Sequence, residues 1–224
     1  MPTLSHSRMD QKLLFLINRQ WTGPVEDRAM ALLSSFAAWA PLFAGLLVLM
    51  LWRGGFHGRV LVLCGALVIG INDGLISRTL KHAIHRPRPY QSEDGVREVD
   101  LARVTPRILA MSKPLRIKYS HPEADIVGNG GRSFPSSHTI NTFSVALLVA
   151  FFYRWGWVAF LPALGVGYSR IYTGSHWPSD VLASIFLGLG STFLILSALE
   201  WLWRRCGEKW VPGLHERHPS LLPR

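Results

Sequence analysis

Long apolar runs constrain this chain more than any other feature. Residues 29–52 form 24 consecutive positions without a charged side chain, whereas one membrane-spanning helix needs about 20. The other apolar runs contain few polar residues, among them Asn72, Asp73 and Arg154. By this hydropathy criterion the chain crosses a membrane repeatedly. The predicted spans are residues 29–52, 60–80, 137–153, 155–170 and 179–203.

Composition excludes other classes of protein. Hydrophobic residues make up 49% of the chain and charged residues only 17%, where soluble domains carry about 25% charged residues. A disordered chain needs low hydrophobicity, and a soluble nucleic-acid binder spreads its basic residues over a polar surface. The net charge of +10 therefore does not indicate a nucleic-acid partner. Cys64 and Cys206 form neither a disulfide framework nor a zinc-binding spacing.

The chain divides into three parts. Residues 1–28 are predicted to be an N-terminal interfacial segment, residues 29–203 a membrane-embedded domain with a polar loop over 81–137, and residues 204–224 a basic C-terminal tail. Apolar residues recur at helical spacing over 13–21, which is typical of a helix lying on the membrane and equally compatible with a polar leader. The predicted fold is all-α: a polytopic membrane helical bundle of about five transmembrane helices plus an N-terminal interfacial helix.

Three polar clusters fall on the same side of these spans. They are Lys81–Pro89, Gly131–Thr139 and Tyr168–Asp180. With five spans, the end of the second, the start of the third, the end of the fourth and the start of the fifth share one membrane face. Unrelated loops would not gather their histidine-rich segments on one side, so the sequence predicts a site there. The opposite face carries a set of basic residues, Arg53, Arg59, Arg154, Arg204 and Arg205.

Positive charges in these clusters predict an anionic ligand. Lys81, Arg88 and Arg170 all lie close to span ends. Guanidinium groups bind tetrahedral oxyanions through paired hydrogen bonds, and lysine acts as a point charge. Ser136 and Ser137 enter the third span, where a helix N-terminus offers free N–H groups to an anion. The pattern indicates a phosphate-binding site.

Two histidines add a nucleophile and an acid. Asp180 falls in the first turn of the last span, close enough to accept a hydrogen bond from His176 and to leave the other ring nitrogen free, as an activated nucleophile requires. His138 can protonate a leaving oxygen as a general acid. These residues predict phosphoryl transfer through a phosphohistidine. The clusters hold no group of carboxylates for magnesium, so the sequence predicts no metal and no cofactor.

Each of these residues also has an ordinary structural explanation. Interfacial Lys and Arg side chains commonly extend to lipid headgroups, and a histidine at a helix start often caps or packs. Asp73 inside the second span is costly to bury, and a structural hydrogen bond to a neighbouring helix explains it better than a function does. His82, His85 and Arg86 are compatible with merely flanking the site.

In its motifs the chain resembles the type-2 phosphatidic acid phosphatase superfamily of membrane lipid phosphatases. The family pattern is Lys, six residues, Arg-Pro; then Pro-Ser-Gly-His; then Ser-Arg, five residues, His, three residues, Asp. The resemblance runs from about Ala29 to Trp203 and departs at Ser137, which replaces glycine. The matching positions are Lys81, Arg88-Pro89, Pro135-Ser136-Ser137-His138, Ser169-Arg170, His176 and Asp180.

The resemblance implies a role for each matched residue. His176 is the nucleophile, Asp180 orients it, and His138 is the general acid. It also implies catalysis without a metal. A positive φ at Ser137 would be strained, but its backbone N–H would still reach the phosphate. The implied phosphate-binding residues are Lys81, Arg88, Ser136, Ser137 and Arg170.

Two rival functions use similar residues differently. Vanadium haloperoxidases resemble the chain in these motifs, but they are soluble, and five predicted spans oppose that function. A non-catalytic anion-binding membrane protein or transporter would not require His176, Asp180 and His138 together. Loss of binding on changing Lys81, without phosphate release by the native protein, would favour this second rival.

An active site at the membrane surface implies an amphiphilic substrate whose chain stays in the lipid bilayer. The resemblance favours undecaprenyl diphosphate, with lipid A 1-phosphate, phosphatidylglycerol phosphate and phosphatidic acid as alternatives. Segment 90–134 is expected to shape that choice. The basic face opposite the site is typical of cytoplasmic loops, which places the active site on the periplasmic or outer side of a bacterial inner (plasma) membrane. The sequence does not indicate an oligomeric state.

Overall fold

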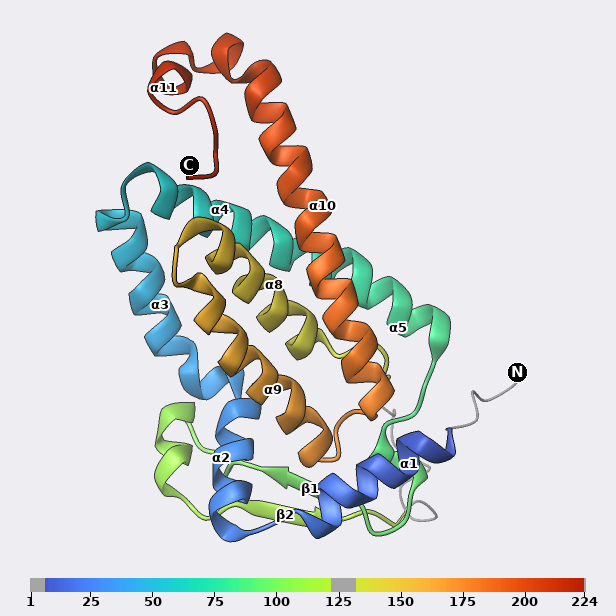
Figure 1. Cartoon of the computed structure of the whole chain (residues 1–224). Helices are drawn as coiled ribbons and strands as arrows, with labels where there is room; N and C mark the ends of the chain where they lie inside the picture. The colour runs from blue at the N-terminus through green and yellow to red at the C-terminus, as the bar shows by residue number, and fades with distance from the viewer. Residues whose placement is uncertain (1–6, 122–131, 224) are drawn as a thin grey trace.

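The computed structural model describes residues 7–121 and 132–223, and these form a helical bundle (Figure 1). Three stretches are long and apolar enough to cross a membrane: Phe36–Arg53, Gly55–Ser92 and Pro178–Trp210. A shorter apolar helix, Ser137–Phe152, packs among them. The predicted all-α membrane bundle is confirmed. Its main helices are α3 (Phe36–Arg53), α4 (Gly55–Ile71), α8 (Ser137–Phe152), α9 (Phe160–Tyr172) and α10 (Pro178–Trp210).

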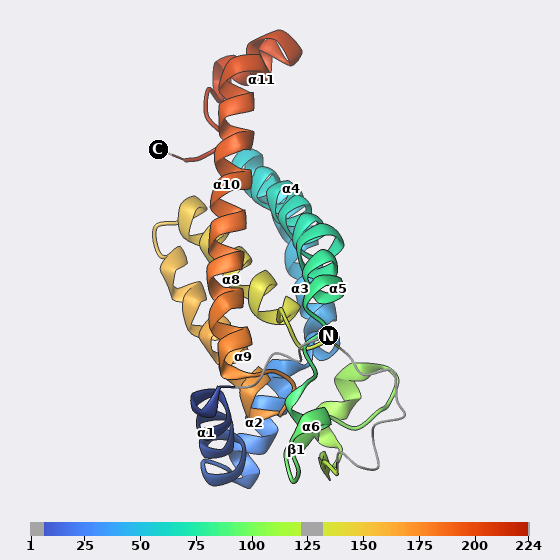
Figure 2. The same ribbon diagram turned by 90° about the vertical axis from the view of Figure 1, so that its right-hand side faces the viewer.

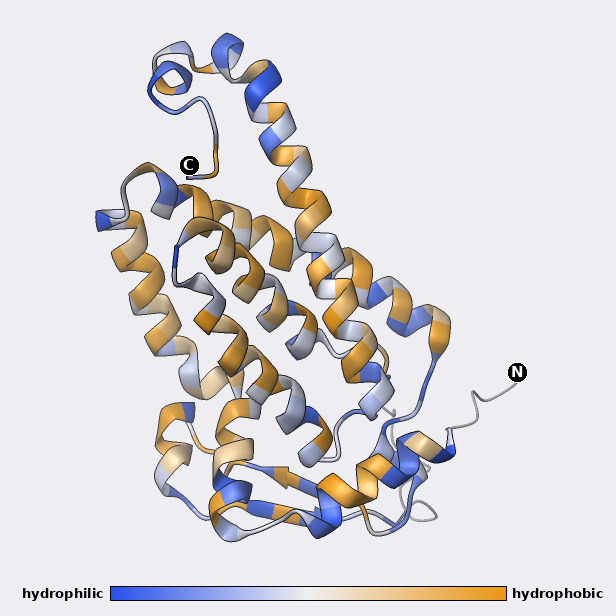
Figure 3. Cartoon of the chain, in the orientation of Figure 1, coloured by the Kyte–Doolittle hydropathy of each residue, from blue (hydrophilic) through white to orange (hydrophobic). Residues whose placement is uncertain are grey.

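The outer surface of the bundle is apolar, as lipid contact requires. Of the 18 residues of α3, only Ala38 is buried, and most of its leucines are exposed. A helix on a water-soluble protein would turn such residues inward. Figure 3 shows the hydrophobic colour running along the bundle helices, with hydrophilic residues gathered toward the two ends.

Helices α8 and α10 approach each other closely. A Cβ atom at Gly188 would lie 2.6 Å from the Ile140 carbonyl oxygen, so only glycine permits this contact. Polar side chains in the spans are paired across helices. Asn72 donates to Ser144 at 2.9 Å, and Asp73 accepts from the Asn141 amide at 3.0 Å. A hydrogen bond to a neighbouring helix is therefore what the structure shows for Asp73.

The first predicted span differs from the structure at its beginning. Residues 29–34 belong to a separate helix, α2 (Pro24–Ser34), and α3 begins only at Phe36. Ser35 breaks the helix because its backbone, at φ −99° and ψ 83°, is not helical. The apolar run therefore continues through a bend that hydropathy alone does not reveal. Helix α2 then packs against α9.

The polar loop between the second and third spans contains ordered elements that the sequence did not predict. Strand β1 (Arg97–Asp100) pairs antiparallel with β2 (Arg116–Tyr119), and Val99 lies opposite Ile117. Residues 122–131, which belong to the loop expected to shape substrate choice, lie outside the described residues. The remaining elements of this region are η2 (Asn72–Ser77), α5 (Arg78–Ile84), α6 (Pro89–Ser92) and η3 (Arg107–Ser112).

The N-terminal segment packs on the protein itself. Helix α1 (Arg8–Phe15) continues into η1 (Leu16–Gln20). Helix α1 lies beside the lower end of α10 (Figures 1 and 2), and η1 packs against α9. Leu14 and Ile17 are buried with Tyr172 and Trp177 in one apolar cluster. The interfacial position of this segment stays a prediction.

The C-terminal residues return toward the bundle. Helix α10 extends to Trp210, beyond the predicted boundary at 203, and α11 (Pro212–Arg217) follows. Glu200 accepts hydrogen bonds from the Leu221 amide and the Ser220 hydroxyl, both at 2.8 Å. A short helix, η4 (Gly156–Ala159), connects α8 to α9.

Candidate active site

The three polar clusters meet at one end of the bundle. Lys81 lies on α5, Ser137 and His138 begin α8, and Arg170 lies in the last turn of α9. The connection from α9 to α10 carries His176. Figure 1 shows the end of α9 and the start of α10 at the lower end of the bundle. The parity argument from the sequence therefore placed the clusters correctly relative to one another.

The start of α8 has the features of an anion site. The Lys81 Nζ atom donates to Ser137 Oγ at 2.8 Å, which joins the first cluster to the second. Ser136 is fully buried, and its backbone N–H donates to Ser184 Oγ at 2.9 Å. Its own side chain does not cap the helix but accepts from the Thr139 hydroxyl at 3.0 Å. The first backbone N–H groups of α8 thus lie next to a lysine.

Ser137 is compatible with the backbone at this position. It is the first residue of α8, and among the described non-glycine residues only His85 has a positive φ. The place of glycine in the family pattern is therefore filled here by a helical serine without backbone strain. Its N–H group keeps the direction that a glycine N–H would have.

Two arginines bring guanidinium groups whose Nε atoms are buried. Arg170 is 9% exposed, and one of its nitrogens donates to the Ser34 hydroxyl. The Nε atoms of Arg170 and Arg88 are buried and have no hydrogen-bond partner within 7–121 and 132–223. A buried charged donor without a partner is unfavourable. An oxyanion bound between these side chains would supply the missing acceptors.

His176 is buried beside these cations. Its side chain is 3% exposed, and its backbone N–H donates to the Arg170 carbonyl at 3.1 Å. Burial lowers the pKa of His176 well below its ordinary value, and the charges of Arg170, Arg88 and Lys81 lower it further, while a contact with the Ser133 backbone opposes them. The imidazole is therefore neutral at neutral pH, as a nucleophile must be.

Asp180 lies near His176 but is not hydrogen-bonded to it. The distance from His176 Nδ1 to Asp180 Oδ2 is 4.0 Å, beyond hydrogen-bonding range. The carboxylate, fully buried, instead accepts from the Trp177 N–H at 3.1 Å and from the Ser133 hydroxyl. A shift of about 1 Å would bring His176 into range, so the direct pairing expected from the sequence stays a prediction.

Arg86 was not recognised from the sequence as more than a flanking residue. Its Nη1 atom lies 2.5 Å from Asp180 Oδ1. Ser133, which also binds Asp180, was not singled out at all. The Arg86-Pro87-Arg88-Pro89 repeat is the one local signal that a second arginine belongs to the site. His82 and His85 are exposed.

His138 completes the arrangement. It is the second residue of α8 and is half-buried. Arg170, Lys81 and Arg88 act on it electrostatically, as they do on His176. The site therefore combines two imidazoles with three shared cations. Within the described part of the chain, no three His, Cys, Asp or Glu side chains gather as a metal site would require.

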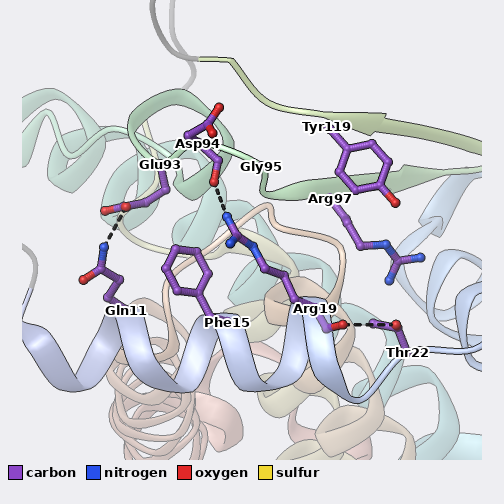
Figure 4. A pocket seen from close by; sticks show the side chains of 9 residues that line it. All are labelled: Gln11, Phe15, Arg19, Thr22, Glu93, Asp94, Gly95, Arg97 and Tyr119. Carbon is purple, nitrogen blue, oxygen red and sulfur yellow. Dashed lines mark hydrogen bonds between the residues drawn. The ribbon is translucent and has the colours of Figure 1, made fainter.

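A separate cavity of about 670 Å³ lies outside this cluster. Figure 4 shows it between the N-terminal helix and the loop that leads into β1, with Gln11, Arg19 and Glu93 among its lining residues. None of the residues predicted for the site lines it. The lining mixes both charges, and the chemistry described above lies elsewhere.

Comparison with known proteins finds a matching family and several similar proteins. The model of the PAP2 superfamily matches residues 59–204. A protein of Bacteroides thetaiotaomicron named lipid A 4'-phosphatase is 26% identical over 194 residues, covering 81% of this chain and 73% of the relative. A putative undecaprenyl-diphosphatase of Escherichia coli, YbjG, is 28% identical over 167 residues, covering 73% of this chain and 68% of the relative.

A solved structure shows the same fold. The crystal structure of Aquifex aeolicus LpxE superposes with a TM-score of 0.60 at 22% identity, covering 88% of this chain and 99% of that one. The family match spans more than half of the chain and includes all three motifs. The chain therefore belongs to the PAP2 superfamily, and it is a membrane-embedded phosphatase.

Proposed function

We propose that the protein hydrolyses a lipid diphosphate, undecaprenyl diphosphate, without a metal ion. The observation that supports this most is the convergence of Lys81, Arg88 and Arg170 on His176 and His138 at the start of α8. Fixed cations stabilise the charge that develops on a transferring phosphoryl group. The phosphate would lie between these cations and the first N–H groups of α8.

The reaction proceeds in two displacements. The Nε2 atom of His176 attacks the terminal phosphorus, because Nδ1 faces Asp180. The bond from phosphorus to the leaving oxygen breaks, and His138 donates a proton to that oxygen. Water then attacks the phosphohistidine and gives a proton to His138, which is thereby restored as the acid. The P–N bond breaks, inorganic phosphate is released, and His176 returns to the neutral imidazole.

A lipid substrate follows from where the site lies. The site residues occupy the ends of apolar helices, so a phosphate can bind there while its hydrocarbon chain stays in the bilayer. One relative is named as a putative undecaprenyl-diphosphatase. Another relative is named lipid A 4'-phosphatase and matches more of this chain, which makes a lipid A phosphate the second candidate substrate. Phosphatidylglycerol phosphate and phosphatidic acid complete the panel to be tested.

The active site is proposed to face the periplasm or the outside of a bacterial inner membrane. Arg53, Arg59, Arg154 and Arg204 lie where bundle helices end or begin, opposite the site. Positive residues of this kind favour the cytoplasmic side. A cysteine replacing the exposed Asp94 should react with an impermeant thiol reagent in intact cells. Protection of that cysteine would reverse the orientation.

The decisive experiment measures phosphate release from undecaprenyl diphosphate in detergent with EDTA present. The native protein should release phosphate, and His176→Ala should release none. Lys81→Gln, which keeps both histidines, should lose most of the activity, since one oxyanion partner is worth about 10²–10³-fold. Release that requires added metal would contradict the mechanism.

If the native protein does not hydrolyse undecaprenyl diphosphate, other lipid phosphates must be tested. The same assay would then use lipid A and glycerophospholipid phosphates. If none of them is hydrolysed while phosphate still binds in a Lys81-dependent manner, the anion-binding alternative replaces the enzyme.

A further inference from the structure

Arg86 lies between two buried carboxylates. Its Nη1 atom is 2.5 Å from Asp180 Oδ1, and its Nη2 atom is 2.7 Å from Asp10 Oδ2. The three side chains are at most 11% exposed. The guanidinium also lies over the Trp177 ring, 5.4 Å from its centroid. With both ends of the planar group bonded, Arg86 has one orientation, and so does the Asp180 carboxylate that it holds.

Asp10 connects the N-terminal helix to the start of α10. Its Oδ1 atom accepts from the Ser179 N–H at 2.9 Å, and its Oδ2 atom accepts from the Ser179 hydroxyl at 2.5 Å. Burial raises the pKa of Asp10, but hydrogen bonds from Ser179 and Arg86 outweigh it and place the pKa below its ordinary value. The carboxylate is therefore charged at neutral pH, and it fixes the residue that precedes Asp180.

Helix α1 is itself firmly placed. Ser7 caps its first turn by accepting from the Asp10 N–H at 3.1 Å. Leu14 and Ile17 are buried in the cluster that contains Trp177 and Val181, which flank the start of α10. Asp10 therefore reaches α10 from a capped helix whose far end is packed in an apolar cluster.

We propose that Asp10 and Arg86 are positioning residues that hold the Asp180 carboxylate at the angle required to orient His176. This inference rests on the proposed function. Asp180 Oδ2 already accepts from Ser133 and Trp177, and it must also meet the Nδ1–H of His176 as the imidazole becomes charged. The bond from Arg86 to Oδ1 leaves Oδ2 turned toward that proton. The N-terminal helix is then part of the active site.

An alternative role for these contacts is fold stability alone. Breaking a buried ion pair destabilises a protein whether or not the pair serves catalysis. The two roles differ in kinetics, because a positioning residue lowers kcat and leaves substrate binding nearly unchanged. Fold stability alone would lower the amount of active protein and leave kcat per folded molecule intact.

The test compares Asp10→Asn with a matched control on the same helix, Gln11→Ala. Gln11 donates to Glu93 Oε2 at 2.8 Å and so ties α1 to the loop that leads into β1 (Figure 4). Asp10→Asn keeps an acceptor for Ser179 but loses the charge facing Arg86. Its kcat per folded protein should fall about tenfold with KM within about twofold. The kcat of Gln11→Ala should stay within about twofold of native.

A second variant covers the case in which Asp10→Asn does not fold. Ser179→Ala removes the exposed hydroxyl shared by Asp10 and Arg86 and leaves both charges paired. Its kcat should fall about threefold with unchanged KM. An unchanged kcat in Asp10→Asn would overturn the positioning role, and so would an equal loss of kcat in Gln11→Ala. In either case the activity of the native protein would still support the proposed function. A native protein without activity on any lipid phosphate would overturn both.

Discussion

Helices α8 and α10 begin at the same end of the bundle, but their first turns are completed differently. At α10, carboxylates of the protein itself accept from the backbone: Asp180 from the Trp177 N–H at 3.1 Å, and Asp10 from the Ser179 N–H at 2.9 Å. At α8, Ser136 makes no side-chain cap bond. A lysine lies beside the next residue instead. Negatively charged side chains therefore bind the backbone at the start of α10, and a positively charged side chain lies at the start of α8.

The two helix starts therefore differ in the charge of the group that each favours. A helix N-terminus carries a partial positive charge that favours anions. At α10 this charge stabilises Asp180, which would repel a phosphate. At α8 it adds to Lys81, Arg88 and Arg170 and attracts one. On the proposed function, the phosphate would bind at the α8 start, and α10 would supply the negative charge that orients His176.

Asp180→Asn should produce the largest effect on this contrast. It removes the Asp180 charge from the α10 start, where Asp10 remains, and it leaves the α8 start unchanged. We expect kcat to fall about 10³-fold or more, as in other enzymes whose histidine loses its orienting carboxylate, with KM within about threefold. Steady-state phosphate release from the lipid substrate measures both constants.

A matched control lies farther along the same helix. Glu200 is bonded to Arg204, Ser220 and Leu221 near the opposite end of α10. Glu200→Gln should lower the unfolding temperature slightly and leave kcat within about twofold. An equal loss of total activity in both variants, with kcat per folded molecule intact, would mean that α10 needs its carboxylates only for folding.

The pH profile should show the next largest effect. The pKa of His176 is lowered by burial and then by Arg170 and Arg88, so the neutral imidazole persists below the ordinary histidine value of about 6.5. The value of kcat/KM should therefore stay level as pH falls through 6.5. It should decline only at lower pH, when His176 becomes protonated.

A contrary profile would be informative. If kcat/KM declined with a midpoint at or above about 6.5, neither burial nor the neighbouring cations would lower the pKa of His176 in the free enzyme. The two helix starts would then be electrostatically independent. The profile is measured at constant ionic strength, because salt screens exposed charges.

The sequence predicted the α8 start better than the α10 start, for a physical reason. The positions of Lys81, His138 and His176 relative to the predicted spans were enough to bring these candidate site residues to one end. The Arg86–Asp10 contact joins positions 76 residues apart. No local sequence pattern predicts this pair, because it forms only when distant segments pack together. The helix break at Ser35 and the pairing of β1 with β2 likewise depend on tertiary contacts.

Ser137→Gly should have the smallest effect. It tests whether the serine hydroxyl is needed at the α8 start. The change removes the hydroxyl that accepts from Lys81 at 2.8 Å and keeps the backbone N–H. If the N–H and the lysine charge hold the phosphate, kcat/KM should stay within about threefold of native. The unfolding temperature should drop slightly, because glycine in a helix costs about 1 kcal/mol relative to alanine.

A large loss of kcat/KM in Ser137→Gly would change the role assigned to the Ser137 side chain. It would mean that the serine hydroxyl positions Lys81 or binds the phosphate directly, so that this chain compensates for the missing glycine with its own hydrogen bond. Comparing Ser137→Gly with Ser137→Ala separates the hydroxyl from backbone flexibility. Equal activity in the two variants assigns the effect to the hydroxyl, and a defect confined to glycine assigns it to the helix start.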